Sequence, residues 1–262
     1  MKRALRKAWA YLTAYYAYML AYRAELVLWA LANSLPFILM GAWMRAAEEG
    51  DFGRGPADMV RYFLAAFIVR QVTVVWVIWE FEQDVLKGRL SHQLMLPYDP
   101  GWRHLFAHLA ERIARLPFAA AIVAGVLILF PGARWIPSLH SLFGATLILV
   151  LVLLVRFTLQ YALAMLAFWT ERASSIENLW MIAYLFLSGL IAPLDFFPPS
   201  VRDLALLTPF PYLVYFPVSV LLGQGQDVLH GVLVLLGWGA FFFIVQRVLW
   251  RLGLRQYSGM GA

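Results

Sequence analysis

Residues 141–169 read SLFGATLILVLVLLVRFTLQYALAMLAFW, and this stretch decides the fold class because Arg156 is its only charged residue. A helix needs roughly 20 apolar residues to cross a bilayer, so the stretch is long enough to span a membrane and to tilt or protrude. In the whole chain, 63% of the residues are hydrophobic and 14% are charged. A typical soluble domain carries about 25% charged residues. The sequence therefore predicts an all-α integral membrane protein.

Further apolar runs of about span length lie on both sides of this stretch. The six predicted spans are 25–44, 59–79, 113–131, 141–169, 176–193 and 230–250. No soluble domain or internal repeat is evident between them. We therefore expect residues 1–262 to form a single transmembrane domain.

The basic residues orient the predicted spans. With both termini in the cytoplasm, fourteen of the 21 Lys and Arg residues fall on the cytoplasmic side and five on the outer side. This bias agrees with the positive-inside rule and predicts a multi-pass protein of the cell (inner or plasma) membrane with both termini cytoplasmic. The net charge of +6 does not indicate a nucleic-acid partner, because the basic residues cluster at the ends of spans and form no single patch.

Two flanking segments have a composition of their own. Residues 1–23 mix basic residues with Trp and Tyr, which predicts an amphipathic helix in the inner membrane interface; the alternative is a simple extension of the first span. Residues 193–229 are apolar but rich in proline, which breaks helices. We expect short broken helices that dip into the outer leaflet there; the alternative is an ordinary hydrophobic outer loop.

Several kinds of chemistry are excluded or weakly indicated. The chain has no cysteine, so it forms no disulfide and no thiolate metal site. It contains no G-x-x-x-x-G-K-[ST] sequence, and none of its three lysines follows a glycine, so it has no P-loop for ATP hydrolysis. His104, His108 and Glu111 share one face of a predicted helix, where they either form a weak metal-ligand set or simply a polar helix face. The expected metal content is none, and no catalytic residue is predicted.

Four polar residues lie inside predicted spans, namely Arg70 and Gln71 in span two and Arg156 and Gln160 in span four. An arginine at the centre of a membrane costs about 2.5–3.5 kcal/mol on insertion scales. No carboxylate is obvious at a matching depth in the apolar runs. The arginines therefore either contact an anionic lipid or substrate group, or serve a structural role by binding exposed carbonyls or a second subunit.

Residues 80–112 form the longest strongly charged segment inside this apolar sequence. Leu90, Leu94 and Leu96 give a short predicted helix one apolar side, and Pro97 and Pro100 end it. A second helix, from about Trp102 to Arg115, returns to the membrane. A short helix held by two spans can transmit movement from a soluble partner into the membrane; the alternative is a helix that merely lies on the membrane surface.

This loop carries a resemblance to a known family. The acidic residues that end span two are followed by L-K-G-R-L-x-x-x-L-x-x-P over Leu86–Pro97. This pattern resembles the coupling region of ABC-2 type transporter permeases. The six predicted spans, the basic N-terminal helix and the exit GLIAP at 189–193 are also similar to that family, so the resemblance covers essentially the whole chain.

The resemblance implies a membrane subunit of an ABC exporter. Two such subunits, identical or paralogous, would form the translocation pathway, and separate ATPase subunits would bind ATP and Mg, with no cofactor in this chain. The implied coupling residues are Glu82, Lys87, Gly88, Arg89, Leu90, Leu94, Leu96 and Pro97. The short turn at 170–177 is a second, smaller contact candidate.

The residue types also suggest a pathway and a cargo. Arg70, Gln71, Arg156 and Gln160 are the candidate pathway residues. The aromatic candidates for an outer gate are Phe196, Phe197, Phe210 and Tyr212. An apolar, aromatic lining suits hydrophobic or amphiphilic cargo in contact with membrane lipid. The rival hypotheses are an intramembrane lipid-modifying enzyme and a channel or assembly scaffold.

Overall fold

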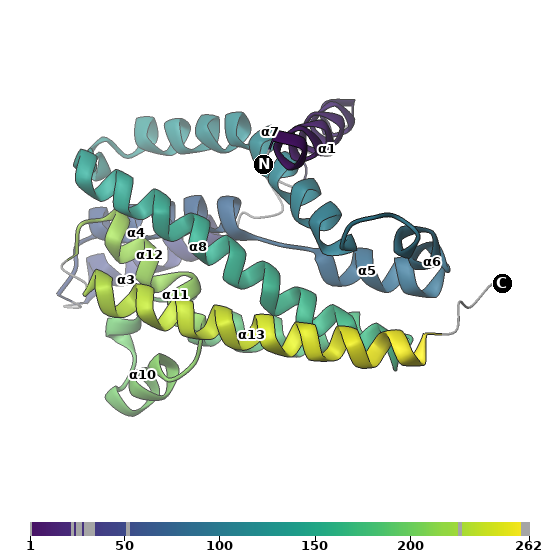
Figure 1. Ribbon diagram of the computed structural model, residues 1–262. Helices are drawn as coiled ribbons and strands as arrows, with labels where there is room; N and C mark the ends of the chain where they lie inside the picture. Colours follow the sequence, from purple (N-terminus) through teal and green to yellow (C-terminus); the bar gives the residue numbers. More distant parts are fainter. Residues whose placement is uncertain are drawn as a thin grey trace.

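The computed structural model describes residues 2–21, 24, 28, 35–50, 53–224 and 227–257. Over these residues the chain is helical and contains no strand (Figure 1). The helices are α1 Lys2–Ala21, α3 Leu35–Glu49, α4 Pro56–Thr73, α5 Val77–Leu86, α6 Arg89–Leu94, α7 Pro100–Leu129, η1 Pro131–Ala133, α8 Leu139–Ala164, η2 Met165–Phe168, α9 Ser174–Leu187, η3 Leu194–Phe196, α10 Pro199–Leu206, α11 Phe210–Leu213, α12 Tyr215–Leu221 and α13 Val228–Gln256.

Four helical segments of the described chain are long and apolar enough to cross a membrane. They are Pro56–Leu86, Pro100–Leu129, Leu139–Phe168 and Val228–Gln256, and they correspond to predicted spans two, three, four and six. Much of predicted span one, residues 25–27 and 29–34, lies outside the described residues. α3 and α9, which overlap predicted spans one and five, have 15 and 14 residues. These lengths are below the roughly 20 residues that a straight span needs, so the count of six spans stays a prediction.

Span two is the central element of the bundle. Of the most apolar 18-residue stretch in this span, 78% is buried, and α4 packs against α3, α7, α8 and α12. Predicted span two, over 59–79, lies within the segment Pro56–Leu86, and the structure adds that its helix ends at Thr73 and restarts at Val77. Val72, Val74 and Val75 are β-branched, which lowers helix propensity. The Thr73 hydroxyl also donates to the Val69 carbonyl one turn earlier, a bond that often bends helices.

Span three continues directly from the charged loop. The predicted loop helix near 102–115 and the predicted span over 113–131 form one helix, α7. Asp99 caps its first turn by accepting a hydrogen bond from the Gly101 N–H, and Pro100 occupies the first turn, where proline is tolerated. Pro117 lies inside the helix, and α7 changes direction along its length (Figure 1).

The remaining long helices pack around these two spans. α8 and α13 run side by side, and α1 lies across the first part of α7 (Figure 1). At Gly253 of α13, an added Cβ would lie 2.0 Å from the ring of Phe168 in η2, so this glycine allows α13 to approach η2 closely. The position of α1 relative to a membrane surface, and thus the interfacial-helix prediction, is not tested by these contacts.

The proline-rich segment 193–229 is divided into short helices, η3, α10, α11 and α12, before α13 begins. The prediction of short broken helices is therefore confirmed for the described part of the segment, while its depth in a membrane stays a prediction. Residues 211–221 are all buried, and α12 packs against α8 and α4. α10 lies at the opposite end of the bundle from α6 (Figure 1).

Candidate functional site

The turn that joins α5 to α6 depends on one glycine. Lys87 ends α5, and Gly88 has a left-handed backbone conformation with φ 67° and ψ 4°. Glycine adopts this conformation without the steric cost that other residues carry. α6 can therefore start immediately after α5 and fold back beside it. We call residues 84–103, which include this turn, the elbow.

Asp84 holds the elbow together. Its side chain is 3% exposed, and its carboxylate lies 2.9 Å from Arg89 and 2.7 Å from Arg103. The Gln93 amide donates a further hydrogen bond of 2.7 Å to the same carboxylate. α5, α6 and the start of α7 therefore form one unit around a single buried charge. The sequence analysis did not select Asp84, although its position shortly before Lys87 and Arg89 was a usable signal.

The predicted coupling residues divide into an exposed and a buried set. Lys87, Arg89, Leu94 and Pro97 are exposed, and Leu96 is half-buried. Met95, which the sequence analysis did not select, is 75% exposed and belongs to the same surface. Leu90 is 0% exposed and packs into a core cluster with Phe81 and Val85, so it does not belong to the exposed surface of the elbow, and its coupling role stays a prediction.

Glu82 is also buried and faces the bundle. Its carboxylate accepts hydrogen bonds from the N–H of Ser174 at 2.6 Å and from the Ser174 hydroxyl at 3.1 Å. Ser174 begins α9 within the predicted second contact at 170–177, of which Thr170, Glu171 and Arg172 are exposed. Glu82 therefore connects the helix before the elbow to a turn far away in the sequence.

His104, His108 and Glu111 form ion pairs and hydrogen bonds within the protein. His104 Nδ1 lies 3.0 Å from a carboxylate oxygen of Glu80, and His108 Nδ1 lies 3.4 Å from Glu111. Glu111 also pairs with Arg112 and Arg115. Among the described residues, no group of three or more His, Cys, Asp or Glu side chains has a geometry that suits a metal ion.

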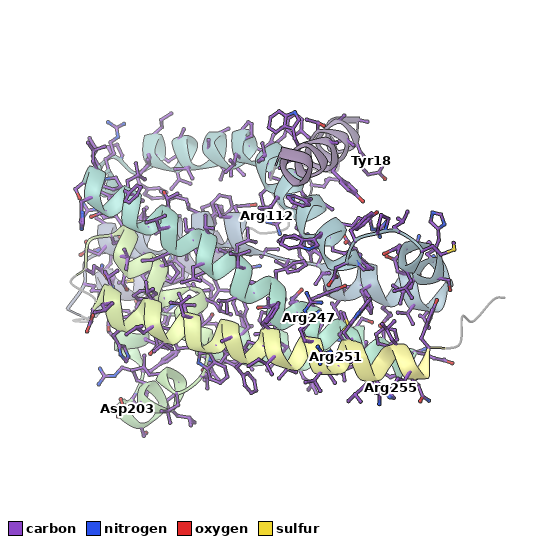
Figure 2. The ribbon with its side chains drawn as sticks, in the orientation of Figure 1. Tyr18, Arg112, Asp203, Arg247, Arg251 and Arg255 are labelled. Atoms are coloured by element: carbon purple, nitrogen blue, oxygen red, sulfur yellow. The ribbon has the colours of Figure 1, made fainter. Side chains whose placement is uncertain are left out.

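Arginines gather where α4, α7 and α8 meet. Arg70 is in the last turn of α4, Arg112 and Arg115 are on α7, and Arg156 is on α8. All four are buried, with exposures of 9%, 5%, 3% and 1%. The sequence analysis counted Arg112 and Arg115 among the basic residues on the cytoplasmic side, which stays a prediction; in the fold both side chains are buried. Figure 2 shows Arg112 between α7 and α8.

Arg156 is held mainly by aromatic rings. Its guanidinium lies 4.4 Å from the ring centre of Tyr184 and 5.1 Å from that of Trp180, and it donates to the Tyr184 hydroxyl at 3.0 Å. A carboxylate is also present: Glu177 accepts a 2.7 Å hydrogen bond from Gln160 and acts electrostatically on Arg156. The expectation that no carboxylate lies near this arginine was therefore wrong. Arg70 and Gln71, the other pathway candidates, are buried in α4.

The four aromatic gate candidates contact different partners. Phe196 stacks near Trp43 with ring centres 5.3 Å apart, and Phe197 packs beside the same core. Phe210 contacts Trp180 at 6.0 Å. Tyr212 is 6% exposed and contacts Phe216. These side chains pack in the core at the α10 end, and the structure does not gather them into one constriction.

Polar contacts also stabilise the end of the bundle at which α10 lies. Asp195 forms an ion pair with Arg54 and accepts a 2.7 Å hydrogen bond from the Tyr215 hydroxyl. Burial and the neighbouring Asp195 raise the pKa of Tyr215 to about 12, so the phenol stays protonated and remains a donor. The Tyr62 hydroxyl donates to the Gly189 carbonyl at 2.6 Å, which ties α4 to the exit of α9.

Comparison with known families agrees with this arrangement. A model of the ABC-2 family transporter proteins matches residues 55–261. The chain belongs to the ABC-2 transporter family. It is therefore a multi-pass membrane protein and the permease component of an ABC transporter. In this family the permease associates with ABC ATPase subunits, which carry the ATPase activity. A search of curated proteins found no match to the chain.

Proposed function

We propose that this ABC-2 permease subunit is part of an exporter and receives mechanical work from an ABC ATPase through the elbow. Two permease subunits, identical or paralogous, form the translocation pathway between them in the cell membrane. The observation that carries the proposal is the division of the elbow into an exposed side with Lys87, Arg89, Leu94 and Met95, and a buried side anchored by Leu90 and Asp84. Such a unit is suited to bind a soluble partner and to move as one body.

The orientation follows from charge. Basic residues are concentrated at the elbow and at the end of α13, where Arg247, Arg251 and Arg255 follow one another along the helix (Figure 2). By the positive-inside rule this end faces the cytoplasm, where ATP is hydrolysed, and both termini lie on that side. α10 then lies on the outer side.

The internal contacts suggest how movement spreads. α5 leads into the elbow, and the break at 74–76 separates α5 from α4, so α5 can tilt without moving the whole span. The Glu82–Ser174 hydrogen bonds carry that tilt to α9. Through Tyr184 and Trp180, α9 contacts Arg156 on α8 and Phe210 in the outer segment. ATP-driven movement at one end thus reaches the opposite end, as alternating access requires.

The cargo in this proposal is hydrophobic or amphiphilic. The exposed side chains along α8 and α13 are largely apolar, and the aromatic residues Phe210 and Tyr212 lie near the outer end of the proposed route. A pathway between two such subunits borders on lipid. Cargo that dissolves in the membrane can therefore enter it from the side.

Co-purification tests the docking assignment. The tagged chain is isolated from its native membrane, and the bound ABC ATPase is identified and quantified by mass spectrometry. We expect Leu94→Asp and Met95→Asp to reduce the amount of ATPase at least about tenfold. Ile136→Asp is the matched control, because Ile136 is 96% exposed in the loop at the opposite end. Unchanged ATPase recovery with both elbow variants contradicts the docking assignment.

A second measurement separates the proposal from its rivals. The chain is reconstituted into liposomes with and without its ATPase, and flux is followed with and without ATP. Transport that requires both supports the exporter. Full flux without ATP indicates a channel, and modification of lipid by the chain alone indicates an enzyme; either result contradicts the proposal.

A further inference from the structure

A buried carboxyl group and a buried amide join α8 to α9. Glu177 lies in the first turn of α9 and is 2% exposed, and Gln160 on α8 is 0% exposed. The Gln160 amide donates a 2.7 Å hydrogen bond to one carboxylate oxygen of Glu177. The other oxygen of each group, Glu177 Oε2 and Gln160 Oε1, has no hydrogen-bond partner among the described residues. Both of these atoms are acceptors when Glu177 is ionised, so neither can satisfy the other.

One added proton would satisfy both oxygens. A protonated carboxyl group has an O–H donor, and an amide oxygen is an acceptor. A proton on Glu177 Oε2 therefore permits a second hydrogen bond, to Gln160 Oε1, beside the bond that is already present. The proton also removes the charge of a buried carboxylate that has only one hydrogen-bond donor, and such a charge is costly in the interior of a protein.

Arg156 is the charged residue that acts on Glu177. α9 packs against α5, α8 and α11, and Arg156 on α8 acts electrostatically on the Glu177 carboxylate. Its guanidinium is nevertheless held by the Tyr184 hydroxyl and by two aromatic rings of α9. The acidic residues of α5 bond to Ser174 and to residues of α6 and α7. α11 contributes Tyr212 as a titratable side chain and no charged one. Glu177 therefore lies near a cation that other groups hold.

A proton fits this pair better than a metal cation does. Calcium and magnesium ions take about six or more ligands, mostly oxygen atoms, whereas the pair offers two free oxygens. The guanidinium of Arg156 repels a metal cation, and the described residues hold no group of His, Cys, Asp or Glu side chains that suits one. A proton needs one oxygen to which it binds and one that accepts the hydrogen bond, and the pair supplies both.

We infer that Glu177 and Gln160 form a proton-binding site. A proton from water binds Glu177 Oε2, the new O–H donates to Gln160 Oε1, and the carboxylate becomes a neutral carboxyl group. When the proton leaves, the ionised oxygen can instead accept a hydrogen bond from Arg156 Nε, which has no acceptor in the described structure. Arg156 then shifts from the phenol of Tyr184 toward Glu177. The proton therefore selects the partner of Arg156.

The inference goes beyond the proposed function, because the site can bind a proton whether or not an ATPase is present. The site nevertheless lies on the proposed route of movement, since Glu177 follows Ser174 by about one turn of α9. Movement that separates α9 from α8 would break the carboxyl–amide pair and release the proton to water. Proton binding and the packing of these two helices are then linked.

Infrared spectroscopy of the full chain, purified without its ATPase, tests the site. At about pH 6, exposed Asp and Glu side chains are ionised because their ordinary pKa is about 4. A C=O band of a carboxylic acid at this pH therefore comes from a shielded carboxyl group. We expect the wild-type chain to show such a band, and we expect D2O to move it to a lower wavenumber because the proton exchanges. Absence of the band contradicts the inference.

Variants assign the band to its residues. Glu177→Gln keeps the size of the side chain and should abolish the band, whereas Glu171→Gln, in the exposed turn before α9, is the matched control and should keep it. Glu177→Asp keeps a carboxyl group and should move the band, which provides a second assignment if Glu177→Gln does not fold. An equal band in wild type and Glu177→Gln overturns the site.

Two further variants test the partners of the carboxyl group. Gln160→Leu should move the band to a higher wavenumber, because the carbonyl loses its hydrogen bond; an unchanged position overturns the pairing with Gln160. Arg156→Leu removes the charge that favours the carboxylate, so the band should persist to a higher pH than in wild type. An equal pH dependence in both chains overturns the exchange of partners by Arg156.

A metal cation gives a different result. If Glu177 is ionised at about pH 6 and its carboxylate band responds to sodium chloride but not to choline chloride, the site binds a metal cation and the proton is overturned. The exporter proposal can also fail separately. ATPase that co-purifies with a chain lacking the acid band leaves that proposal intact and removes the proton site. An acid band in a chain that binds no ATPase keeps the proton site and removes the exporter proposal.

Discussion

The Glu82 carboxylate accepts two hydrogen bonds from Ser174, one from its N–H at 2.6 Å and one from its hydroxyl at 3.1 Å. Glu82 precedes the elbow and Ser174 begins α9, so the contact joins two segments that are distant in the sequence. Among the described residues, this contact links α5, which leads into the elbow, to α9, whose Trp180 and Tyr184 lie against Arg156.

Glu82→Ala should weaken both folding and coupling. It leaves the half-buried Ser174 N–H without its acceptor, and such a loss costs about 1–3 kcal/mol where the group is fully buried. In reconstituted transporter we expect transport to fall more than ATP hydrolysis, because the ATPase still binds but its movement no longer reaches α9. Ser174→Ala keeps the N–H bond and should have the smaller effect. Equal losses of transport and hydrolysis would argue against a coupling role.

Leu90 and Leu94 should behave differently although both were predicted on one surface. Leu90 is fully buried, and truncation of such a leucine costs about 2–5 kcal/mol, so Leu90→Ala should lower the unfolding midpoint. Leu94 is 38% exposed, and Leu94→Ala should leave the midpoint nearly unchanged while reducing ATPase binding. Thermal unfolding and co-purification measure the two effects. A larger drop in the unfolding midpoint for Leu94→Ala than for Leu90→Ala would contradict the burial of Leu90.

Gly189 should tolerate no side chain. Its φ is +85°, and an added Cβ would lie 2.9 Å from both Tyr215 Cβ and the Tyr62 hydroxyl. The left-handed conformation alone costs roughly 1–2 kcal/mol for other residues, and the crowding adds to this. Gly223→Ala is a matched control, because Gly223 has φ +70° and no atom within 4 Å of its added Cβ. We expect Gly189→Ala to lower the unfolding midpoint more than Gly223→Ala; equal effects would show that crowding contributes nothing.

Arg156→Leu should insert into the membrane normally but reduce transport. The substitution removes a buried charge, so the cost of insertion falls, whereas the contacts with Tyr184 and Trp180 are lost. Arg156→Lys keeps the charge but lacks the planar group that lies over the two rings, and we expect intermediate transport. Membrane fractionation and flux in liposomes are the measurements. Wild-type flux in Arg156→Leu would remove any functional role for the charge.

Much of the architecture could be predicted from composition because membrane insertion acts on each segment separately. The apolar runs containing α7, α8 and α13 are long and carry few charges, so their cost of transfer into lipid identifies them without knowledge of their neighbours. The elbow could be predicted because Gly88 permits a left-handed turn and Pro97 and Pro100 restrict the backbone locally. Residues in the proline-rich segment could be assigned to short helices for the same reason.

The sequence did not reveal which way several side chains face. Leu90 and Leu94 are one helical turn apart, and only the packing of α6 against α5 buries one and exposes the other. Arg112 and Arg115 sit at the polar end of an apolar run, and only the packed bundle shows that both side chains are buried. The break before Val77 has no proline or glycine to reveal it.

The sequence by itself determined that this chain is a helical membrane protein with a charged elbow between two spans, and it pointed to the ABC-2 family. These properties depend on local hydropathy and backbone restriction, which each segment carries alone. Only the tertiary structure decided that Glu82 meets Ser174, that Glu177 lies near Arg156, and that buried arginines from α4, α7 and α8 lie close enough to act on one another. Those contacts join helices far apart in the sequence, so they exist only once the helices have packed.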